Sequence, residues 1–558
     1  MTAKPWLKQY DAGVPAAMNY PAVPVTAFLE EAARTYGERD ALVYRDQAVI
    51  FHTLEQLTER LACGLVRWGL RKGDVVGLLM PNWPQFVISF FAVLRAGGVA
   101  AAINPAYKAR ELEFQLKDSG AVMVIAQMEA YELLQSVRDK TQVRTIALTG
   151  GEDGVRLGEW LRGRAQPPAE LPALQTGDVW LGAWAAEGVP VSLPAVGPED
   201  AAIFQYSGGT TGVPKAAIGL HRNLAANTLQ FRAWLSGLKD GQETALLAIP
   251  LYHVYGMVVG MCVSLRLGAR MVLQPDPRDL NEILRLIQTY QPAFYPGVPA
   301  MYAALNQHPD VISGKVGLRS IRACISGSAP LLREVQERFE ALSGAKLMEG
   351  YGLSEAPTAT HCNPMFGEKR PGSIGLPLPD VDCRLVSLED STREVGAGEI
   401  GELTLRGPQV MAGYHGMAEE TALVLRDGWL FTGDIARMDG DGYFYLVDRK
   451  KDLIKVGGLQ VWPREVEEVL AEHPAVSEAA AAGVPHPMRG EVVKAWVVLR
   501  AGAAASAEEL REWCEQRLAS FKTPVEIAFR ERLPRTLVGK LLRRELVREH
   551  LEAADQKV

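Results

Sequence analysis

The segment from Tyr206 to Lys215 has the residue types needed to hold a polyphosphate. It reads YSGGTTGVPK and follows the strand-like run AAIFQ. Glycines let backbone N–H groups turn toward an anion, hydroxyls add donors, and a lysine supplies positive charge. The segment therefore predicts a triphosphate-binding loop formed by Ser207, Gly208, Gly209, Thr210, Thr211, Gly212 and Lys215.

This segment is not a Walker A loop. That motif reads GxxxxGK[ST] and opens a helix, whereas Lys215 lies three residues after Gly212 and is followed by Ala216. Pro214 and the β-rich run KAAIGL instead predict a turn into another strand, with helix resuming only near Asn223. An ordinary surface turn is the alternative, but such turns seldom combine so many hydroxyls with a terminal lysine.

Three further segments place polar residues near predicted strands. PLYHVYG (250–256) sets a histidine among aromatic and apolar residues, where imidazole is more often simply buried. SGSAPL (326–331) is predicted to join a strand to a helix, with its backbone donors at the helix N-terminus. MEGYGLSEA (348–356) is predicted to be a loop whose glutamate offers a hard oxygen to Mg²⁺, although a lone loop glutamate is usually solvated. The candidates are His253, Gly327, Tyr351, Gly352, Ser354 and Glu355.

The last third of the chain adds charged candidates. The run DGWLFTGDIARMDGDGYFYLVDRKKD (427–452) contains Asp434, whose carboxylate can accept two donors at once. Alone, Asp434 is more simply a turn residue, and the basic end of the run a solvated surface. LPRTLVGKLLRREL (533–546) places Lys540 at a predicted helix start, which by itself indicates an amphipathic helix.

A scaffold of strands and helices must bring these candidates together. In the first part of the chain, helical runs alternate with DVVGLLM, GGVAAAIN and AVMVIA, which predicts a parallel sheet covered by helices. Residues 151–198 show no period and are predicted to be a connecting excursion. After Gly367, short strands and turns predict a β-rich subdomain, and past Lys450 a smaller α+β unit ends in a basic helix.

Composition narrows the class of protein. A chain of 558 residues is too long for one ordinary core. The net charge of -7 argues against a non-specific nucleic-acid binder, and six scattered cysteines without a CxxC pair suggest neither a zinc site nor a disulfide framework. We expect no transmembrane segment, because no run of about 20 apolar residues occurs. A reducing cytosol fits these features.

Together, YSGGTTGVPK and the motifs behind it resemble the adenylate-forming superfamily, which includes acyl-CoA synthetases, adenylation domains of peptide synthetases and firefly luciferase. The run 427–452 is similar to the long signature of fatty acyl-CoA synthetases, and family likeness alone favours the long-chain fatty acyl-CoA synthetases. The order and spacing of the motifs match over residues 30–550. The resemblance is therefore effectively full length.

The resemblance implies a role for each matched residue. In the first 360 residues, the 207–215 loop would hold the ATP phosphates, Thr210 and Glu355 would hold Mg²⁺, and His253 would lie beside the acid. The residues implied to border adenine, phosphate or the acid pocket are Gly327, Tyr351, Gly352 and Ser354, with Tyr255 and Met257 as pocket walls.

The C-terminal matches imply nucleotide and coenzyme contacts. Asp434 and Arg449 would reach the nucleotide, Lys451 would be the hinge, and Lys540 would be the catalytic lysine. Coenzyme A would bind near Lys455, Gly457 and Gly458. The two glycines would let the pantetheine arm pass close to the backbone.

The implied fold is α/β. A large domain (1–447) of two sheet-and-helix subdomains and a β-rich subdomain is followed by a hinge (448–452) and a small mobile α+β domain (453–558). The implied reaction joins a fatty acid, most simply a long-chain one, to AMP with release of pyrophosphate and then transfers the acyl group to coenzyme A. ATP, Mg²⁺ and coenzyme A are the expected cofactors and substrates.

Several alternatives stay open at this point. Phe431 stands where fatty acyl members often carry histidine, and Lys455 resembles the coumarate ligase and luciferase branch. A medium-chain or aryl-CoA ligase, an enzyme that loads a carrier protein and a non-catalytic nucleotide-binding scaffold are the rivals. We expect a cytoplasmic protein; peripheral association with the inner membrane surface and homodimer formation are both open.

Overall fold

The computed structural model describes residues 4–187, 189–207, 214–457, 459–536 and 541–555. The chain divides into two compact units. The larger holds residues 6–382 and 406–430, and the smaller holds residues 1–5, 383–405 and 431–558. The smaller unit is therefore wider than the predicted C-terminal domain, because it also takes in β-rich segments that precede the predicted hinge.

The larger unit contains a seven-stranded sheet in the order β7-β6-β5-β3-β4-β8-β9. Its strands run parallel except for β9, which is antiparallel to β8. This arrangement confirms the predicted parallel sheet. The strands are β3 (Val75–Leu79), β4 (Val99–Ala102), β5 (Ala121–Gln127), β6 (Thr145–Thr149), β7 (Val179–Trp180), β8 (Ala201–Ser207) and β9 (Lys215–Leu220).

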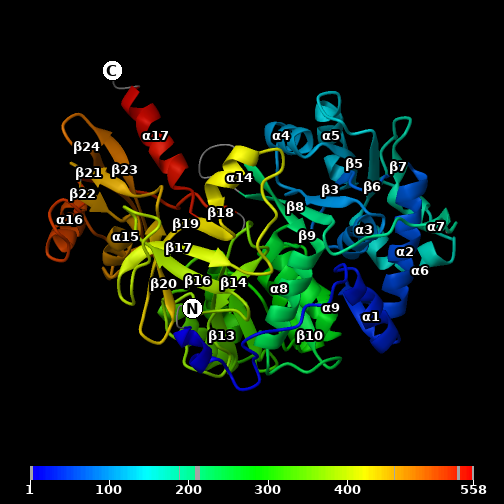
Figure 1. The fold of residues 1–558 in the computed structure, drawn as a ribbon, viewed down its shortest axis with the longest axis horizontal. Helices are drawn as coiled ribbons and strands as arrows, with labels where there is room; N and C mark the ends of the chain where they lie inside the picture. Colours follow the sequence, from blue (N-terminus) through cyan, green and yellow to red (C-terminus); the bar gives the residue numbers. More distant parts are fainter. Residues whose placement is uncertain (1–3, 188, 208–213, 458, 537–540, 556–558) are drawn as a thin grey trace. The chain divides into compact units, whose positions relative to one another are not determined.

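Helices cover this sheet, since every residue of β3 is buried. Leu116 of α4 and Leu134 of α5 share a core with the strand residue Val124. A second group of helices, α2, α3, α6 and α7, packs together (Figure 1). The bounds are α1 (Ala27–Tyr36), α2 (Phe51–Arg67), α3 (Pro84–Arg95), α4 (Ala109–Ser119), α5 (Tyr131–Arg138), α6 (Leu157–Leu161) and α7 (Leu181–Glu187).

A second set of strands completes the larger unit. The order β10-β11-β1-β2 forms one sheet and β12-β13-β14-β15 another, and bridges through Phe294 join β10 to β12. Two sheet-and-helix subdomains were predicted, and both are present. The strands are β1 (Asp40–Tyr44), β2 (Gln47–Ile50), β10 (Thr244–Leu247), β11 (Arg270–Leu273), β12 (Ala323–Ser326), β13 (Lys346–Gly352), β14 (Ala359–Cys362) and β15 (Leu376–Pro377).

The helices around these strands include one π-helical segment, Tyr255–Cys262, in which every residue is buried. Helices of this kind are rare in proteins, and many of those that occur lie at functional sites. The α-helices are α8 (His221–Trp234), α9 (Val263–Leu267), α10 (Leu280–Tyr290), α11 (Pro299–Gln307), α12 (Pro309–Ile312), α13 (Arg333–Ser343) and α14 (Ala418–Val424).

Three details differ from the sequence expectations. Residues 151–198 are not structureless, because α6, β7 and α7 lie there; each has seven residues or fewer, too few to show a period. Residues 348–352 form the end of β13 rather than a loop. The helix after SGSAPL begins only at Arg333, because Leu332 is still extended, so Gly327 does not lie at its N-terminus.

The smaller unit contains two β-sheets. In the first, β16, β17, β19 and β20 lie side by side, as the predicted β-rich subdomain requires. In the second, the order is β22-β21-β24-β23, with β25 beside β24. The strands are β16 (Asp382–Val386), β17 (Ile400–Arg406), β19 (Trp429–Met438), β20 (Phe444–Arg449), β21 (Ile454–Val456), β22 (Leu459–Val461), β23 (Val476–His486), β24 (Gly490–Leu499) and β25 (Glu526–Phe529).

Alternation along β24 lets helices pack on both faces of the second sheet. Val493 belongs to one core, with residues of α15 (Pro463–Ala471) and α16 (Ala507–Glu515), whereas Trp496 belongs to another. That other core includes Leu546 of α17 (Arg543–Asp555), which lies against β23 (Figure 1). The predicted small α+β unit and its final helix are therefore confirmed. The helix itself is not basic, because its three arginines are outnumbered by three glutamates and one aspartate.

Candidate functional site

The predicted phosphate loop joins two antiparallel strands. Ser207 ends β8 and pairs with Lys215, which begins β9. A strand rather than a helix follows the loop, so the rejection of a Walker A motif is confirmed. Lys215 lies within the described chain, whereas the candidates Gly208, Gly209, Thr210, Thr211 and Gly212 lie outside it.

A distant segment, residues 411–415, is hydrogen-bonded along β9. The Ile218 N–H donates to the Gly413 carbonyl at 2.9 Å, and the Ala412 N–H donates back to the Ile218 carbonyl at 3.0 Å. Likewise, the His415 N–H donates to the Ala216 carbonyl at 2.9 Å. These main-chain bonds hold Tyr414 beside the strand that begins with Lys215.

Tyr414 connects two of the predicted site residues. Its hydroxyl donates to Oε1 of Glu355 at 2.8 Å, and the Lys215 ammonium lies 5.3 Å from the centre of its ring. Lys215 also forms an ion pair with Glu420 of α14. Burial, and then the charge of Glu355, raise the pKa of Tyr414, so its hydroxyl stays protonated and able to donate.

Sequence reasoning missed Tyr414. It lies in the run MAGYHGM, where a tyrosine between a glycine and a histidine has no marked chemical pattern. The available signal was that glycines flank it at 413 and 416, both with positive φ in the structure. Such glycines indicate a backbone path that other residues rarely follow.

Glu355 lies just beyond the end of β13. The Met411 N–H donates to the Glu355 carbonyl at 2.9 Å, and the carboxylate is half-buried. Among the described residues, no group of three or more His, Cys, Asp and Glu side chains could hold a metal by itself. Mg²⁺ usually takes only one or two carboxylates plus phosphate oxygens, so a single carboxylate fits this ion.

The neighbouring candidates of the same motif lie around that strand end. Tyr351 packs edge-on against His361, with the ring centres 5.8 Å apart. Gly352 pairs with Ala359 of β14, and a Cβ at position 352 would lie only 1.8 Å from the Thr358 carbonyl oxygen. Ser354 follows in the half-buried turn before Glu355.

The structure also brings two candidates for the acid side together. The Tyr255 hydroxyl donates to the Ile325 carbonyl at 2.6 Å, and its ring lies 3.4 Å from where a Cβ on Gly327 would be. His253 is half-buried just before the π-helix, and its Nδ1 accepts from the Tyr255 N–H at 3.3 Å. Met257, within the π-helix, is fully buried.

In the smaller unit, Asp434 and Arg449 are partners. They pair across β19 and β20, and Arg449 Nε lies 3.0 Å from Asp434 Oδ1. Asp434 is only 4% exposed, so its carboxylate has a fixed direction. These two residues were predicted to reach the same nucleotide, and the sheet places them next to each other.

The remaining candidates follow Arg449 along the chain. Lys451 lies in the turn between β20 and β21, and the Lys455 N–H donates to Glu491 at 2.8 Å. Gly457 has φ +57°, and no atom lies within 4 Å of where its Cβ would be, so its backbone is open on that side. Gly458 and Lys540 lie outside the described residues.

Comparisons with known proteins agree with this architecture. A family model described as AMP-binding enzyme matches residues 29–415, and a model of the AMP-binding enzyme C-terminal domain matches residues 465–540. The class of protein is that of the adenylate-forming acyl-CoA ligases, which form AMP and join an acid to a thiol. The chain belongs to the AMP-binding enzyme family.

Three relatives illustrate the range of the family. A long-chain-fatty-acid–CoA ligase of Bacillus subtilis (strain 168) is 41% identical over 556 residues, 98% of each chain. A feruloyl-CoA synthase of Amycolatopsis sp is 36% identical over 92% of this chain and 97% of its own. The anthranilate CoA ligase AuaEII, solved with anthranoyl-AMP, has a TM-score of 0.83 and 27% identity over 96% of this chain and 98% of its own.

Proposed function

We propose that this chain converts a long-chain fatty acid into its coenzyme A thioester through an acyl-adenylate. The likeness to the Bacillus subtilis ligase supports the substrate class. The observation that carries the chemistry is the convergence of Glu355 and Lys215 on Tyr414, which sets one carboxylate and one ammonium group beside the predicted phosphate loop.

In the first step, the acid carboxylate attacks the α-phosphorus of ATP and displaces pyrophosphate. Lys215 exchanges its partner Glu420 for phosphate oxygens, and Glu355 would hold a Mg²⁺ ion, which would neutralise charge on the polyphosphate. Lys540 meets the charge that develops at the reacting carboxylate and phosphate. Asp434 accepts hydrogen bonds from the ribose, with Arg449 beside it.

In the second step, the coenzyme A thiol attacks the acyl-adenylate carbonyl and AMP leaves. The C-terminal domain (453–558) rotates about Lys451 between the two steps, so that Lys540 withdraws and the open backbone at Gly457 meets the pantetheine arm. The thiol of coenzyme A is itself the nucleophile, so no protein nucleophile takes part.

The decisive experiment measures AMP and thioester formation with acids from short to long and with ferulate included. We expect AMP and thioester in equal amounts, with the highest kcat/KM for long-chain acids. A preference for ferulate would identify an aryl-CoA ligase instead, the alternative that the feruloyl-CoA synthase relative supports. Release of inorganic phosphate without AMP would contradict the proposal.

The role of Lys540 has its own test. Lys540→Ala is expected to lower the adenylation rate by about 10²- to 10³-fold, the usual effect of removing one preorganised charge contact. Thioester formation from supplied acyl-adenylate should remain largely intact, because the lysine withdraws before that step. Equal loss in both half-reactions would contradict the proposed rotation.

Two finer proposals accompany this function. Among the described residues no helix is both long and apolar enough to cross a bilayer. Long-chain acids partition into membranes, so we propose peripheral association with a membrane surface, and a homodimer as the commonest assembly. Sedimentation with acid-loaded vesicles and light scattering of the purified protein test the two separately.

A further inference from the structure

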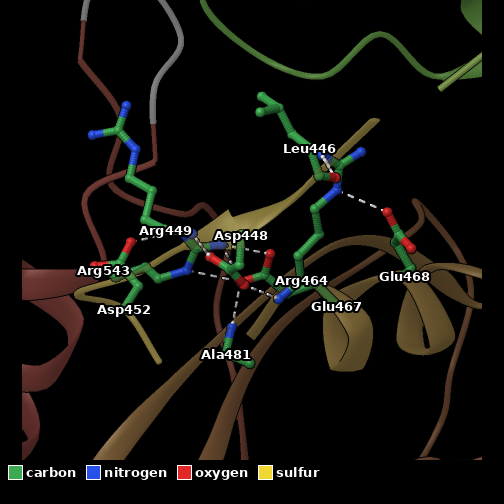
Figure 2. Close-up of polar contacts among 9 residues, drawn as sticks. All are labelled: Leu446, Asp448, Arg449, Asp452, Arg464, Glu467, Glu468, Ala481 and Arg543. Carbon is green, nitrogen blue, oxygen red and sulfur yellow. Dashed lines mark hydrogen bonds and ion pairs between the residues drawn. The ribbon is translucent and has the colours of Figure 1, made fainter. Parts of the chain in front are cut away.

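The smaller unit contains a cluster of charged residues around Arg543, the first residue of α17 (Figure 2). Its Nη2 donates to both carboxylate oxygens of Glu467, at 2.9 and 2.7 Å, and its Nε donates to Oε1 at 3.1 Å. Glu467 lies in α15, and its Oε1 also accepts the Ala481 N–H of β23 at 2.7 Å. The start of α17 is thus tied to both α15 and β23.

Both partners are charged and mostly withdrawn from solvent. The side chains of Arg543 and Glu467 are 22% and 14% exposed. Burial raises the pKa of Glu467, and the charge of Arg543 opposes that rise. Burial by itself would lower the pKa of Arg543, but the carboxylates around it keep the net pKa above its ordinary value. A planar guanidinium held on two carboxylate oxygens fixes direction as well as distance.

The same guanidinium reaches the predicted hinge segment, residues 448–452. Arg543 Nη1 lies 3.4 Å from Asp452 Oδ2. At the other end of the hinge, Asp448 accepts the Arg464 N–H at 2.8 Å and the Arg449 N–H at 2.7 Å (Figure 2). The cluster therefore connects the hinge, the first turn of α15 and the first residue of α17.

Arg543 is three positions after Lys540 in the sequence. Three residues of chain span at most about 11 Å, so an anchor at Arg543 limits how far that lysine can lie from the hinge segment. Ion pairs buried in this way are weak sources of net stability, but they can specify one geometry. Next to the catalytic lysine, an ion pair that fixes the geometry of the chain matters more for the reaction than one that adds stability.

We propose that Arg543 is a positioning residue for the adenylation step: its ion pairs with Glu467 and Asp452 fasten the start of α17 to the hinge segment and thereby set the position from which Lys540 acts. The inference rests on the proposed two-step function and on the role of Lys540 in its first step. Arg543 itself touches no reacting atom.

The test compares the two half-reactions in Arg543→Met, Arg543→Lys and the control Arg544→Met. Arg544 is the adjacent, exposed arginine, with no ion pair among the described residues. Adenylation is measured as acid-dependent pyrophosphate exchange, and thioester formation starts from supplied acyl-adenylate. Both substitutions at position 543 are also made in the Lys540→Ala background, and thermal unfolding is followed for every variant.

We expect Arg543→Met to lower kcat for adenylation by about 10- to 100-fold while the KM for ATP and the thioester step change less than about threefold, because a misplaced group loses transition-state contacts only. Arg543→Lys keeps a cation but not the planar guanidinium, so its kcat for adenylation should fall by about fivefold. In the Lys540→Ala background neither substitution should lower residual adenylation further, since residues acting as a unit are not additive.

Equal losses in both half-reactions, or full additivity with Lys540→Ala, would overturn the inference and leave Arg543 with a role in folding only. If Arg543→Met fails to fold, Arg543→Lys alone decides, because it keeps a charge opposite Glu467. Wild-type protein that forms no AMP would instead refute the proposed function, so the two failures are distinguishable.

Discussion

The side chain of Tyr414 contacts two charged groups, Glu355 through its hydroxyl and Lys215 through its ring. Its hydroxyl fixes one oxygen of Glu355 and leaves the other oxygen available to a cation, while its ring faces the Lys215 ammonium. A carboxylate held by a donor on one oxygen needs no reorganisation when Mg²⁺ arrives. Tyr414 therefore supports the carboxylate that we propose to bind Mg²⁺.

Tyr414→Phe removes the hydroxyl and keeps the ring. Without this hydrogen bond the Glu355 side chain must be ordered when Mg²⁺ binds, which costs up to about 1.5 kcal/mol. We therefore expect the Mg²⁺ concentration for half-maximal adenylation to rise by up to about 10-fold, with a smaller change in kcat. Magnesium titrations of pyrophosphate exchange measure this. The control is Tyr131→Phe, which removes a buried hydroxyl that donates to Asp178 at 2.8 Å, away from these residues. A similar magnesium shift in both variants would contradict the role.

Among the secondary-structure elements, the end of β13 has the tightest packing near the candidate site. Gly352 lies so close to the Thr358 carbonyl that no side chain fits, and Glu355 follows three residues later. The contact between β13 and the start of β14 therefore determines the position of Glu355 and its carboxylate. A shift of this strand end would be transmitted to Glu355.

Gly352→Ala should force β13 and β14 apart. Overpacking of this kind costs about 1–3 kcal/mol, and a displaced catalytic group can lower kcat/KM by about 100-fold. Denaturant unfolding and adenylation kinetics report the two effects. Gly317→Ala is the matched control, because no atom lies within 4 Å of its Cβ position and its φ is not positive. Normal activity in Gly352→Ala would show that the strand end tolerates displacement.

The elements with a long, regular pattern were predictable, and the short ones were not. One of the helical runs, Leu54 to Trp68, repeats its apolar spacing over several turns and corresponds to α2. The uninterrupted apolar run AVMVIA corresponds to the buried strand β5. In contrast, α6, β7 and α7 carry too few residues for a period. The helix after SGSAPL was predicted too early, because side chains cannot show that Leu332 keeps an extended backbone.

At the scale of the whole molecule, two buried histidines make the larger unit sensitive to acid. Burial lowers the pKa of His221 to about 4, with the Asp200 charge partly opposing the shift, and burial lowers the pKa of His361 to about 3. The unfolded chain takes up these protons near pH 6.5. Between those values and pH 6.5 the unfolded state binds more protons, so stability falls as the pH falls.

From pH 7 to pH 5 the two histidines together should lower the free energy of unfolding by about 3–4 kcal/mol. Urea unfolding at the two pH values measures the loss. His221→Gln keeps an acceptor for the Val25 N–H, which now donates to His221 Nδ1 at 3.3 Å, and removes the titration. Between pH 7 and pH 5 this variant should lose about half as much unfolding free energy as the wild type. An unchanged pH dependence would show that His221 does not contribute to the acid sensitivity.

The residues of the candidate site could be predicted only where they belong to a recognisable sequence motif. Lys215 was predicted from local residue types, whereas Glu355, Asp434 and Arg449 were predicted from the family resemblance. Tyr414 was missed because its importance comes from main-chain pairing between β9 and residues 411–415, which are almost 200 positions apart. Contacts between such distant segments leave no trace in a local pattern, and the Arg543 cluster escaped prediction for the same reason.

The main-chain pairing of β9 with residues 411–415 has an evolutionary consequence. Because backbone hydrogen bonds fix the spacing between Lys215 and Tyr414, that spacing does not depend on which side chains line the buried π-helix at 255–262. Substitutions that keep the π-helix packed are therefore expected to leave the spacing between Lys215 and Tyr414 unchanged. We expect a library that varies these positions, but keeps Gly256, to yield enzymes with new acid preferences that still make AMP. Gly256 is kept because a Cβ there would lie 2.2 Å from the Pro250 carbonyl oxygen.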